Sequence, residues 1–587
     1  MPPMPPMSQH SIDNPVLPGF HADPSICRVG DDYYLATSTF EWWPAVRIHH
    51  SRDLVHWRHH SYALTRRSQL DLTGHPDSCG IWAPCLSFAH GQFWLIFTDV
   101  RSMYGAYKDA HNYLVTAPSI DGPWSEPIHL NSSGFDPSLF HDDDGRSWLL
   151  NQQWLHHPGR HNFNGILLQQ FDRASGRLIG PVKNIYAGTT LGVVEGPHLY
   201  RRKGWYYLLT AEGGTFYEHA VTLARSRQID GPYETLPGNP LLTAYRRRTD
   251  GLQRAGHASL VQTAQGDWWL AHLCGRPLEW SGPKAQATAD PSADTQAATT
   301  ANNQADSRAG AATAAEGTDI DYGGLHCPLG RETALQPLTW RDDDWPEIHG
   351  GSNTPRMQVA APDLPPHAFA PEPVRDDFDA PELSPHFNAL RLPFDASWIS
   401  LTERPGHLRL KGRESLMSLF QQSLVARRQQ HFHCRVETRL DFEPASFQQM
   451  AGLVAYYNTG NHAYLHVSRA LEGGARVLRV YVNRDGSLSE PADAVVLAPG
   501  PVDLRLEFHH ASYQFSHAQH GGAWQTIGPA LDTAMLSDEA VTRFVDGYAR
   551  AFGFTGNFVG LACQDLAGSR CVADFDHFSY LPLDDRA

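Results

Sequence analysis

The chain repeats one strand pattern five times. Each copy joins a short segment ending in a bulky aliphatic residue to a polar turn and an aromatic-rich strand. The copies are ADPSICRVGDDYYLATST from Ala22, WAPCLSFAHGQFWLIFTD from Trp82, FDPSLFHDDDGRSWLLNQ from Phe135, EGPHLYRRKGWYYLLTAE from Glu195 and GHASLVQTAQGDWWLAHL from Gly256. We call one equivalent residue near the start of each copy its anchor. The anchors are Pro24, Pro84, Pro137, Pro197 and Ala258, and they are separated by 60, 53, 60 and 61 residues. Such a regular spacing indicates a repeat architecture.

Each repeat has room for about four strands. Polar turns such as Asp143-Asp144-Gly145 join two runs rich in Tyr, Trp, Leu and Ile, a pattern typical of a β-hairpin, and more strand-like stretches lie between the copies. Radial repetition of four-stranded sheets is a β-propeller. The sequence therefore predicts an all-β fold that begins with a five-bladed propeller.

The innermost strand of every blade lines the central channel, and the start of each repeat is the expected innermost strand. The positions just before the anchors hold Asp23, Trp82, Asp136, Glu195 and His257. A single Asp before Pro is commonly a turn or cap residue. Three acids at equivalent repeat positions instead favour a site in the channel.

Paired carboxylates about 6.5 to 9.5 Å apart leave room for a water and a sugar, which is the arrangement for inverting hydrolysis of a glycosidic bond. One carboxylate must be ionised and the other protonated. A third carboxylate nearby raises the pKa of the group that keeps its proton, because like charges repel.

The segments GFHADPSI, GFDPSLF and VVEGPHLY resemble the three signature segments of glycoside hydrolase family 43. The resemblance is closest to β-xylosidases that carry an extra C-terminal β-sandwich, and it extends from Asn14 to Leu581. It implies a five-bladed propeller and an inverting mechanism that needs no cofactor. It also implies that Asp23 is the general base, Glu195 the general acid, and Asp136 the residue that tunes and orients the acid.

The same resemblance implies a sugar pocket formed by Phe40, Trp82, Thr215 and Arg331, with Arg276 as a weaker competitor for the arginine role. The aromatic faces would stack on the pentose, and the guanidinium would donate paired hydrogen bonds to its hydroxyls. His257 matches a family histidine that approaches a calcium ion in the channel through water. Because calcium prefers oxygen ligands, a buried structural histidine is the alternative.

The propeller is predicted at residues 11–345, with an insertion inside it and a linker and a second domain after it. Residues 281–320 consist almost wholly of small and polar residues, which predicts a flexible insertion. Residues 346–371 are Pro-rich and form the predicted linker, and residues 372–587 alternate like antiparallel strands of a lectin-like jelly-roll sandwich. By resemblance this domain packs on the active site, and FTGNFVG, with Phe554 and Phe558, is the candidate loop that narrows the pocket. A capped pocket implies exo action on short oligosaccharides.

The formal charge of −16 disfavours nucleic acid or an anionic membrane as the partner. Neither a signal peptide nor a run of about 18 apolar residues is evident, so a cytoplasmic location is expected. The eight cysteines include no CxxC pair, which argues against a zinc site and favours buried free thiols. A homo-oligomer is in keeping with the resemblance.

Three alternatives stay open beside release of xylose from the non-reducing ends of β-1,4-xylo-oligosaccharides. An α-L-arabinofuranosidase or dual-activity enzyme acting on arabinose-substituted oligosaccharides would use the same pocket, since the two pentoses present similar hydroxyls. A non-catalytic glycan-binding propeller would not need all three acids. A retaining fructan-type hydrolase would show RDP and ECP motifs, whereas this chain has EGP at Glu195 and lacks RDP.

Overall fold

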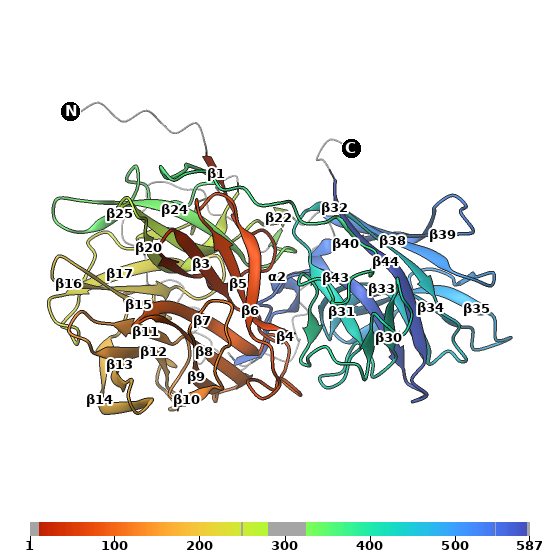
Figure 1. Cartoon of the computed structure of the whole chain (residues 1–587), viewed down its shortest axis with the longest axis horizontal. Coiled ribbons are helices and arrows are strands. Elements are labelled where there is room, and N and C mark those ends of the chain that lie inside the picture. The colour runs from red at the N-terminus through yellow and green to blue at the C-terminus, as the bar shows by residue number, and fades with distance from the viewer. Residues whose placement is uncertain (1–10, 248–250, 280–323, 546–547, 584–587) are drawn as a thin grey trace, which may run out of the picture.

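The computed structural model describes residues 11–247, 251–279, 324–545 and 548–583. Two domains built almost wholly of strands lie side by side, the first coloured red to green and the second cyan to blue (Figure 1). The predicted flexible insertion at 281–320 lies outside the described residues. No helix in the described ranges is long and apolar enough to cross a membrane.

The first domain is the predicted five-bladed propeller. Each blade is an antiparallel sheet whose first strand begins at one of the five repeats. In chain order the blades are β2 (Ser25–Val29), β3 (Asp32–Thr37), β5 (Ala45–Ser51) and β6 (Arg58–Leu64); β7 (Gly80–Ala89), β8 (Gln92–Ser102), β9 (Asp109–Ala117) and β10 (Ile128–Asn131); β11 (Ser138–His141), β12 (Ser147–Trp154), β13 (Phe163–Asp172) and β14 (Arg177–Tyr186); β15 (Glu195–Arg202), β16 (Trp205–Glu212), β17 (Ala220–Ser226), β18 (Glu234–Thr235) and β19 (Leu242–Thr243); β20 (Gln253–Gln262), β21 (Trp268–Gly275), β24 (Glu332–Trp340) and β25 (Pro346–Ile348).

The first strands of the blades contact one another around the channel, in the pairs β2 with β7, β11 with β15, and β15 with β20. They are therefore the innermost strands, as predicted. The fifth blade extends further than expected, because its outermost strand β25 begins at 346, where the linker was placed. Beyond it, β26 (Gln358–Ala360) pairs with β1 (Ser11–Asp13).

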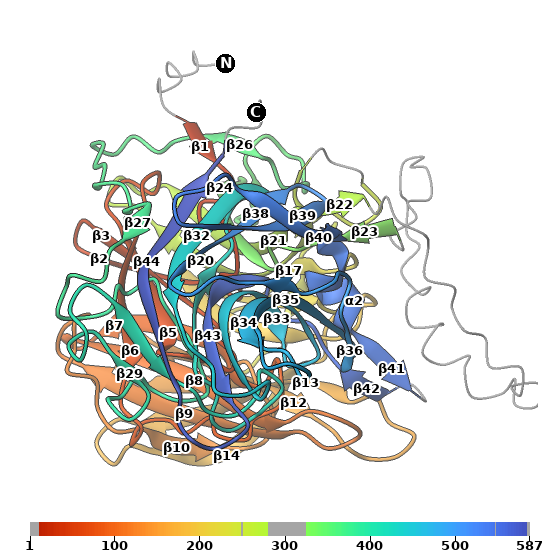
Figure 2. The same ribbon diagram turned by 90° about the vertical axis from the view of Figure 1, so that its right-hand side faces the viewer.

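The second domain is a sandwich of two antiparallel sheets, as predicted, and its strands cross in front of the propeller in Figure 2. One sheet contains β27 (Arg375–Asp376), β29 (Ile399–Ser400), β30 (Leu408–Lys411), β32 (His433–Asp441), β38 (Val502–His509), β39 (Ser512–Gln519), β40 (Gln525–Asp532) and β44 (Val572–Pro582). The other contains β31 (Leu424–Arg428), β33 (Gln449–Asn458), β34 (Asn461–Arg469), β35 (Arg476–Arg484), β36 (Ser487–Ser489), β37 (Val495–Val496) and β43 (Phe558–Asp565).

A turn of 3-10 helix η2 (Thr533–Leu536) and the short helix α2 (Asp538–Val541) follow β40. They lead into the hairpin of β41 (Arg543–Val545) and β42 (Tyr548–Ala551). The chain then passes through residues 552–557 before entering β43. Because this excursion leaves the sandwich between two of its strands, it is free to lie against the propeller.

The two domains share one apolar core. Its cluster combines Phe40 and Trp42 of the propeller with Tyr456, Phe554 and Phe558 of the sandwich. The contact continues in the backbone, since β4 (Trp42–Trp43) pairs with β28 (Ala389–Leu390). Burial of large aromatic side chains from both partners fixes the relative position of the domains.

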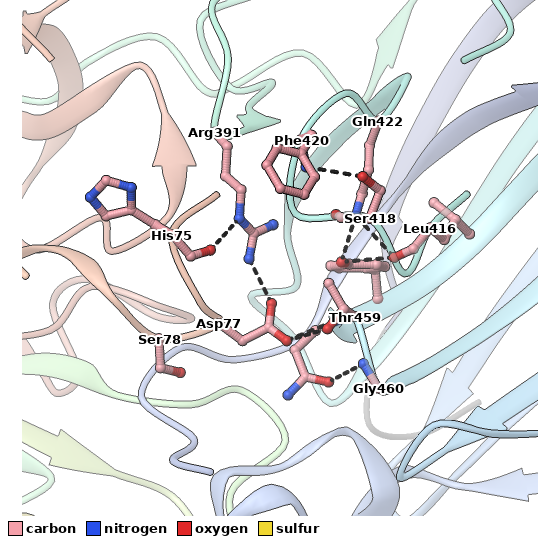
Figure 3. A network of polar contacts seen from close by, with 12 residues as sticks. His75, Asp77, Ser78, Arg391, Leu416, Ser418, Phe420, Gln422, Thr459 and Gly460 are labelled. Atoms are coloured by element: carbon pink, nitrogen blue, oxygen red, sulfur yellow. Dashed lines mark hydrogen bonds and ion pairs between the residues drawn. The ribbon is translucent and has the colours of Figure 1, made fainter. Parts of the chain in front are cut away.

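A polar network reinforces this interface (Figure 3). The Arg391 guanidinium donates to the Asp77 carboxylate at 2.8 Å and to the His75 carbonyl at 2.7 Å. Asp77 also accepts a hydrogen bond from the Thr459 hydroxyl. A loop of the propeller is thereby held to two segments of the sandwich.

The eight cysteines all lie within the described residues and are free. Six are buried, whereas Cys27 and Cys571 are half-buried. As the scattered spacing predicted, most of the cysteines are buried free thiols.

Candidate active site

The residues directly before the five anchors share an unusual backbone conformation. Asp23, Ala83, Asp136, Gly196 and His257 have φ of 55°, 40°, 53°, 56° and 38°. For residues other than glycine, this left-handed region costs on the order of 1 to 3 kcal/mol each, so it persists only where the surroundings enforce it. Asp23 and Asp136 lie just before β2 and β11, whereas Ala83, Gly196 and His257 lie at register shifts within β7, β15 and β20. A backbone irregularity thus recurs at every innermost strand.

A cavity of about 290 Å³ lies beside three of these positions, Asp23, Asp136 and His257. Asp23, Phe40, Trp82, Lys108, Phe135, Asp136, Phe163, Val193, Glu195, Gly214, Thr215, Phe216, His257, Arg331, Phe552 and Phe554 line it. Its volume is near the lower end of the range for small-molecule pockets, about 300 to 1,000 Å³. The lining combines aromatic side chains with a few charged groups, which suits a small polar ligand that has apolar faces.

Asp23 is held by its own blade and by the next one. The Ser38 hydroxyl donates to Asp23 Oδ2 at 2.6 Å and in turn accepts from the Ala83 amide at 2.8 Å. On the other side, His257 Nδ1 lies 3.7 Å from Asp23 Oδ1. These contacts fix the carboxylate in the cavity wall.

Asp136 and Glu195 differ from ordinary carboxyl groups in their proton affinity. Burial raises the pKa of Glu195 to about 8, and the negative charge of Asp23 adds to the shift. Burial and the charges of Glu195 and Asp23 likewise hold the pKa of Asp136 well above its usual range. At neutral pH the site therefore retains protons on this pair, which is what an acid catalyst requires.

Asp136 is oriented by the backbone of the residue after Glu195. The Gly196 amide donates to Asp136 Oδ2 at 3.1 Å. A Cβ atom at Gly196 would lie 3.1 Å from the Cε1 atom of His257, which is a tight contact, and its φ is positive, so both space and conformation favour glycine. The backbone thus ties Asp136 to the strand that carries Glu195.

Arg331 presents a guanidinium group to the cavity. Its Nε and Nη2 atoms are buried without a hydrogen-bond partner among the described residues. The group stacks 4.2 Å above the Phe554 ring and lies near Asp538 of the sandwich. A guanidinium group in a cavity wall beside an aromatic face is suited to the hydroxyls of a sugar ring.

Arg276, the competitor for this role, lies elsewhere. It forms a bidentate pair with Glu332, at 2.8 and 2.7 Å, and does not line the cavity. Its donors are already engaged, whereas those of Arg331 are not.

Aromatic rings surround the space next to Arg331. The Phe40 and Phe554 centroids are 5.8 Å apart, and Trp82 meets Phe554 edge-on at 5.4 Å. Thr215 also lines the cavity, with Phe216 beside it. Of the residues predicted to bind the sugar, Phe40, Trp82, Thr215, Arg331 and His257 line this cavity.

The prediction for Phe558 was wrong. Its side chain is fully buried in the interface, stacked on Trp42 at 3.6 Å and 11°, and it does not line the cavity. Phe558 is the first residue of β43, paired opposite Arg428, so the sheet holds it in the shared core. Phe554 of the predicted loop does line the cavity, and Phe552 joins it.

The possible calcium site at His257 does not fit the donors found here. Among the described residues there is no group of three or more His, Cys, Asp or Glu side chains arranged to hold a metal ion. His257 instead faces Asp23 and Asp136, with Nδ1 3.7 and 4.0 Å from their oxygens. Burial lowers its pKa, which favours the neutral imidazole.

Lys108 was not anticipated from the sequence. Its ammonium group lies over the rings of Trp82, Phe135 and Trp154, at 5.5, 5.7 and 4.5 Å. Burial lowers its pKa to about 8, although nearby acids oppose the shift. No repeat position marks this residue, since it lies between β8 and β9 rather than at the start of a blade. Phe135, by contrast, directly precedes Asp136, and its place in the repeat was an available signal.

A five-bladed propeller that gathers three carboxylates and an arginine in one aromatic cavity is the arrangement of a sugar-cleaving enzyme. Comparison of the chain with known protein families supports the same class of enzyme. Residues 12–346 match the model of glycosyl hydrolases family 43, and residues 375–581 match the β-xylosidase C-terminal concanavalin A-like domain. The chain belongs to glycosyl hydrolase family 43, which confirms the resemblance of its three signature segments.

Similarity to individual members covers nearly the full length. The chain is 46% identical to a β-xylosidase of Bacillus subtilis, over 97% of this chain and 99% of that protein. It is also 46% identical to the xylosidase/arabinosidase 43B of Humicola insolens, over 97% and 98%. The crystal structure of a xylan β-1,4-xylosidase from Bacillus halodurans superposes with a TM-score of 0.87 at 53% identity, covering 97% of this chain and 100% of that one.

Proposed function

We propose that the protein is an exo-acting, inverting glycoside hydrolase that releases xylose from the non-reducing ends of short β-1,4-xylo-oligosaccharides. One observation carries this proposal. Asp23, Asp136 and Glu195 line a single cavity together with Arg331 and aromatic rings, and the pKa of Glu195 is raised to about 8. Similarity to β-xylosidases over nearly the whole chain supports the choice of sugar.

In this mechanism Asp23 acts as the general base. Its carboxylate accepts a proton from a water molecule, and the water oxygen attacks the anomeric carbon on the face opposite the leaving group. Glu195 donates its proton to the glycosidic oxygen as the carbon–oxygen bond breaks. The anomeric configuration inverts, and the two residues then exchange protons with solvent to restore the starting state.

Asp136 has a supporting part in this scheme. Because two adjacent carboxyl groups resist a second ionisation, Asp136 would help the pair to keep the proton that Glu195 donates. The two groups titrate together, so an apparent pKa belongs to the pair. The hydrogen bond from the Gly196 amide would orient Asp136 as the pair changes its protonation state.

Exo action follows from the cover over the cavity. Phe552 and Phe554 belong to the excursion of the sandwich and form part of the cavity lining. A cavity of about 290 Å³ closed on that side admits the end of a chain rather than its middle. A chain end is expected to present one sugar to Arg331 and the aromatic rings.

α-L-Arabinofuranosidase or dual activity is the second candidate. The xylosidase/arabinosidase of Humicola insolens is as similar to this chain as the β-xylosidase of Bacillus subtilis. Both pentoses offer hydroxyls to one arginine and an apolar face to the rings. Comparing the two nitrophenyl glycosides, β-D-xyloside and α-L-arabinofuranoside, measures this preference directly.

The catalytic roles predict different losses for the two variants. Glu195→Gln should lose at least about 100-fold on xylobiose but much less on an aryl xyloside, because nitrophenolate leaves without a proton. Asp23→Asn should lose at least about 100-fold on both substrates, since water must be activated in either case. Proton NMR of the wild-type reaction should show α-xylose first.

Glu212→Gln is the matched control for these variants. Glu212 is also a buried acid with a raised pKa, but it bonds Thr189 and Thr222 and does not line the cavity. It should keep its turnover on xylobiose. A wild type that cleaves neither glycoside nor xylobiose would refute the proposal and favour a glycan-binding propeller, and β-xylose as the first product would refute inversion.

A further inference from the structure

A carboxylate of the second domain lies directly behind the arginine of the cavity. Asp538 is the first residue of α2 and is completely buried. Its Oδ2 atom accepts a hydrogen bond from Arg254 Nη2 at 2.8 Å and lies 3.6 Å from Arg331 Nε. Its Oδ1 atom accepts from the Tyr457 hydroxyl. One acid of the sandwich is therefore shared between two arginines of the propeller.

The charge balance of this cluster depends on Asp538. Arg254 and Arg331 are both buried, and each positive charge disfavours the other in a water-poor site. Burial lowers the pKa of Arg331, and the charge of Asp538 opposes that shift. Without this carboxylate, the charge of Arg254 would repel Arg331 and the charge of Asp23 would attract it. Both forces would displace the Arg331 guanidinium from its position.

Glu539, the other acid that pairs with Arg254, forms no ion pair with Arg331 among the described residues. Glu539 Oε1 lies 3.4 Å from Arg254 Nη1 and accepts from the Tyr217 hydroxyl, while its Oε2 accepts from the Cys327 amide. These bonds dock α2 on the propeller. Arg331 has an ion pair only with Asp538 among the described residues. The helix is thus anchored by one acid and presents the other to the sugar-binding arginine.

We infer that Asp538 is a positioning residue that holds the Arg331 guanidinium for the hydroxyls of the terminal sugar, so that the sandwich completes the sugar subsite by charge as well as by cover. The inference rests on the proposed function for the identity of the sugar. Asp538 itself does not line the cavity and acts through Arg331. Its loss should weaken sugar binding more than it slows the chemical step.

The first test is Asp538→Asn, which keeps the shape of the side chain and removes its charge. We expect the KM for nitrophenyl xyloside and the inhibition constant of xylose each to rise about tenfold or more, with kcat changed less than about threefold. Xylose binding measured by calorimetry should weaken by the same factor. Calorimetry needs no turnover, so it tests the inference separately from the proposed activity.

Asp77→Asn is the matched control, since it also removes an interdomain carboxylate paired with a buried arginine. The Asp77 carboxylate binds Arg391 and Thr459 (Figure 3), neither of which lines the cavity. This variant should melt at a lower temperature and keep the wild-type inhibition constant for xylose. An equal loss of xylose affinity in both variants would mean a general interface effect and would overturn the inference.

A double variant separates positioning from stability. If Asp538 acts through Arg331, adding Asp538→Asn to Arg331→Lys should weaken xylose binding by less than about twofold further. Multiplication of the two single effects would overturn the inference.

Tyr457→Phe tests the same link if Asp538→Asn fails to fold. It removes one hydrogen bond to Asp538 and keeps the ring in the sandwich core. Xylose affinity should fall about two- to fivefold, and unchanged affinity in this variant would also overturn the inference. A wild type that binds xylose but cleaves no xyloside would instead refute the proposed function and leave the role of Asp538 intact.

Discussion

Burial of the Glu195 carboxyl group determines the pH range in which this residue retains its proton. Removing a carboxylate from water disfavours its ionised form, and Asp23 nearby adds repulsion. The same two effects act on Asp136. The site thus holds an acid at neutral pH, while the Ser38 hydroxyl fixes Asp23 in the same cavity.

The pH profile should show this proton. Because Glu195 must be protonated to act as the acid and its pKa is about 8, kcat/KM should fall about tenfold per pH unit above about pH 8. Rates of xylobiose cleavage between pH 5 and pH 10 measure this fall in kcat/KM. The Glu212→Gln variant should show the same fall. A rate that stays constant to pH 10 would contradict the assignment of Glu195 as the acid.

The same shift predicts a pH-dependent stability. The folded pKa lies above the value of about 4.3 for an unfolded Glu, so the folded state binds the proton more tightly. Its stabilising contribution is complete below about pH 4.3 and is lost as the pH rises to about 8. Glu195→Gln has no such group. The Tm of Glu195→Gln minus the Tm of the wild type should therefore increase between pH 5 and pH 9. A decrease of this difference, measured by calorimetry, would contradict the raised pKa of Glu195.

Sequence reasoning found acids and a histidine that recur with the repeats, and the family resemblance added Phe40, Thr215 and Arg331, but neither signal marked Lys108. Asp23, Asp136 and His257 precede their anchors, and each lies in the cavity. Lys108 comes from a connection without a repeat position, so only the folded chain brings it beside Trp154. Phe558 was misplaced because Phe554 and Phe558 lie in one motif, and the point where β43 begins decides which ring enters the core.

At the scale of elements, the repeat spacing predicts the five blades because each copy begins an innermost strand. The end of the fifth blade was harder to predict. Its outermost strand β25 is only three residues long and contains a proline, which is weak evidence for a strand in a sequence. The excursion that covers the cavity has no periodic pattern, and its contacts are divided between the sandwich core and the propeller.

The contact between this excursion and the propeller depends on a glycine. Gly330 has φ of 75°, and a Cβ atom there would lie 1.8 Å from the Thr555 carbonyl oxygen. The neighbouring Arg331 amide donates to that oxygen at 3.3 Å. The backbone of the cover therefore lies directly against the backbone that carries the sugar-binding arginine.

Gly330→Ala should accordingly displace Phe554 as well as destabilise the fold. We expect the free energy of unfolding to fall by at least about 2 kcal/mol, with an increased KM for xylobiose. Gly351→Ala is the control, because Gly351 also has a positive φ of 77° but open space around its Cα. Thermal melts and steady-state kinetics of both variants separate the clash from backbone strain, and equal KM values in the two variants would contradict the prediction.

At the scale of the whole molecule, the shared core makes the two domains one folding unit. Trp42 and Phe558 come from different domains and stack in full burial. Separation of the domains would expose such aromatic surface to water, which is unfavourable. The cavity needs both domains, because Arg331 belongs to the propeller while Phe552 and Phe554 belong to the sandwich.

This coupling predicts that the wild type melts in a single calorimetric transition at the temperature where activity is lost. Trp42→Ala should cost about 3 to 5 kcal/mol and weaken the link between the domains, so its transition should broaden or split in two. Trp345→Ala is the control, since Trp345 is buried within the propeller core and should lower the Tm without splitting the transition. Two transitions in the wild type would show that the domains melt independently. The shared core would then fix their relative position without joining their stabilities, and loss of activity should follow whichever transition comes first.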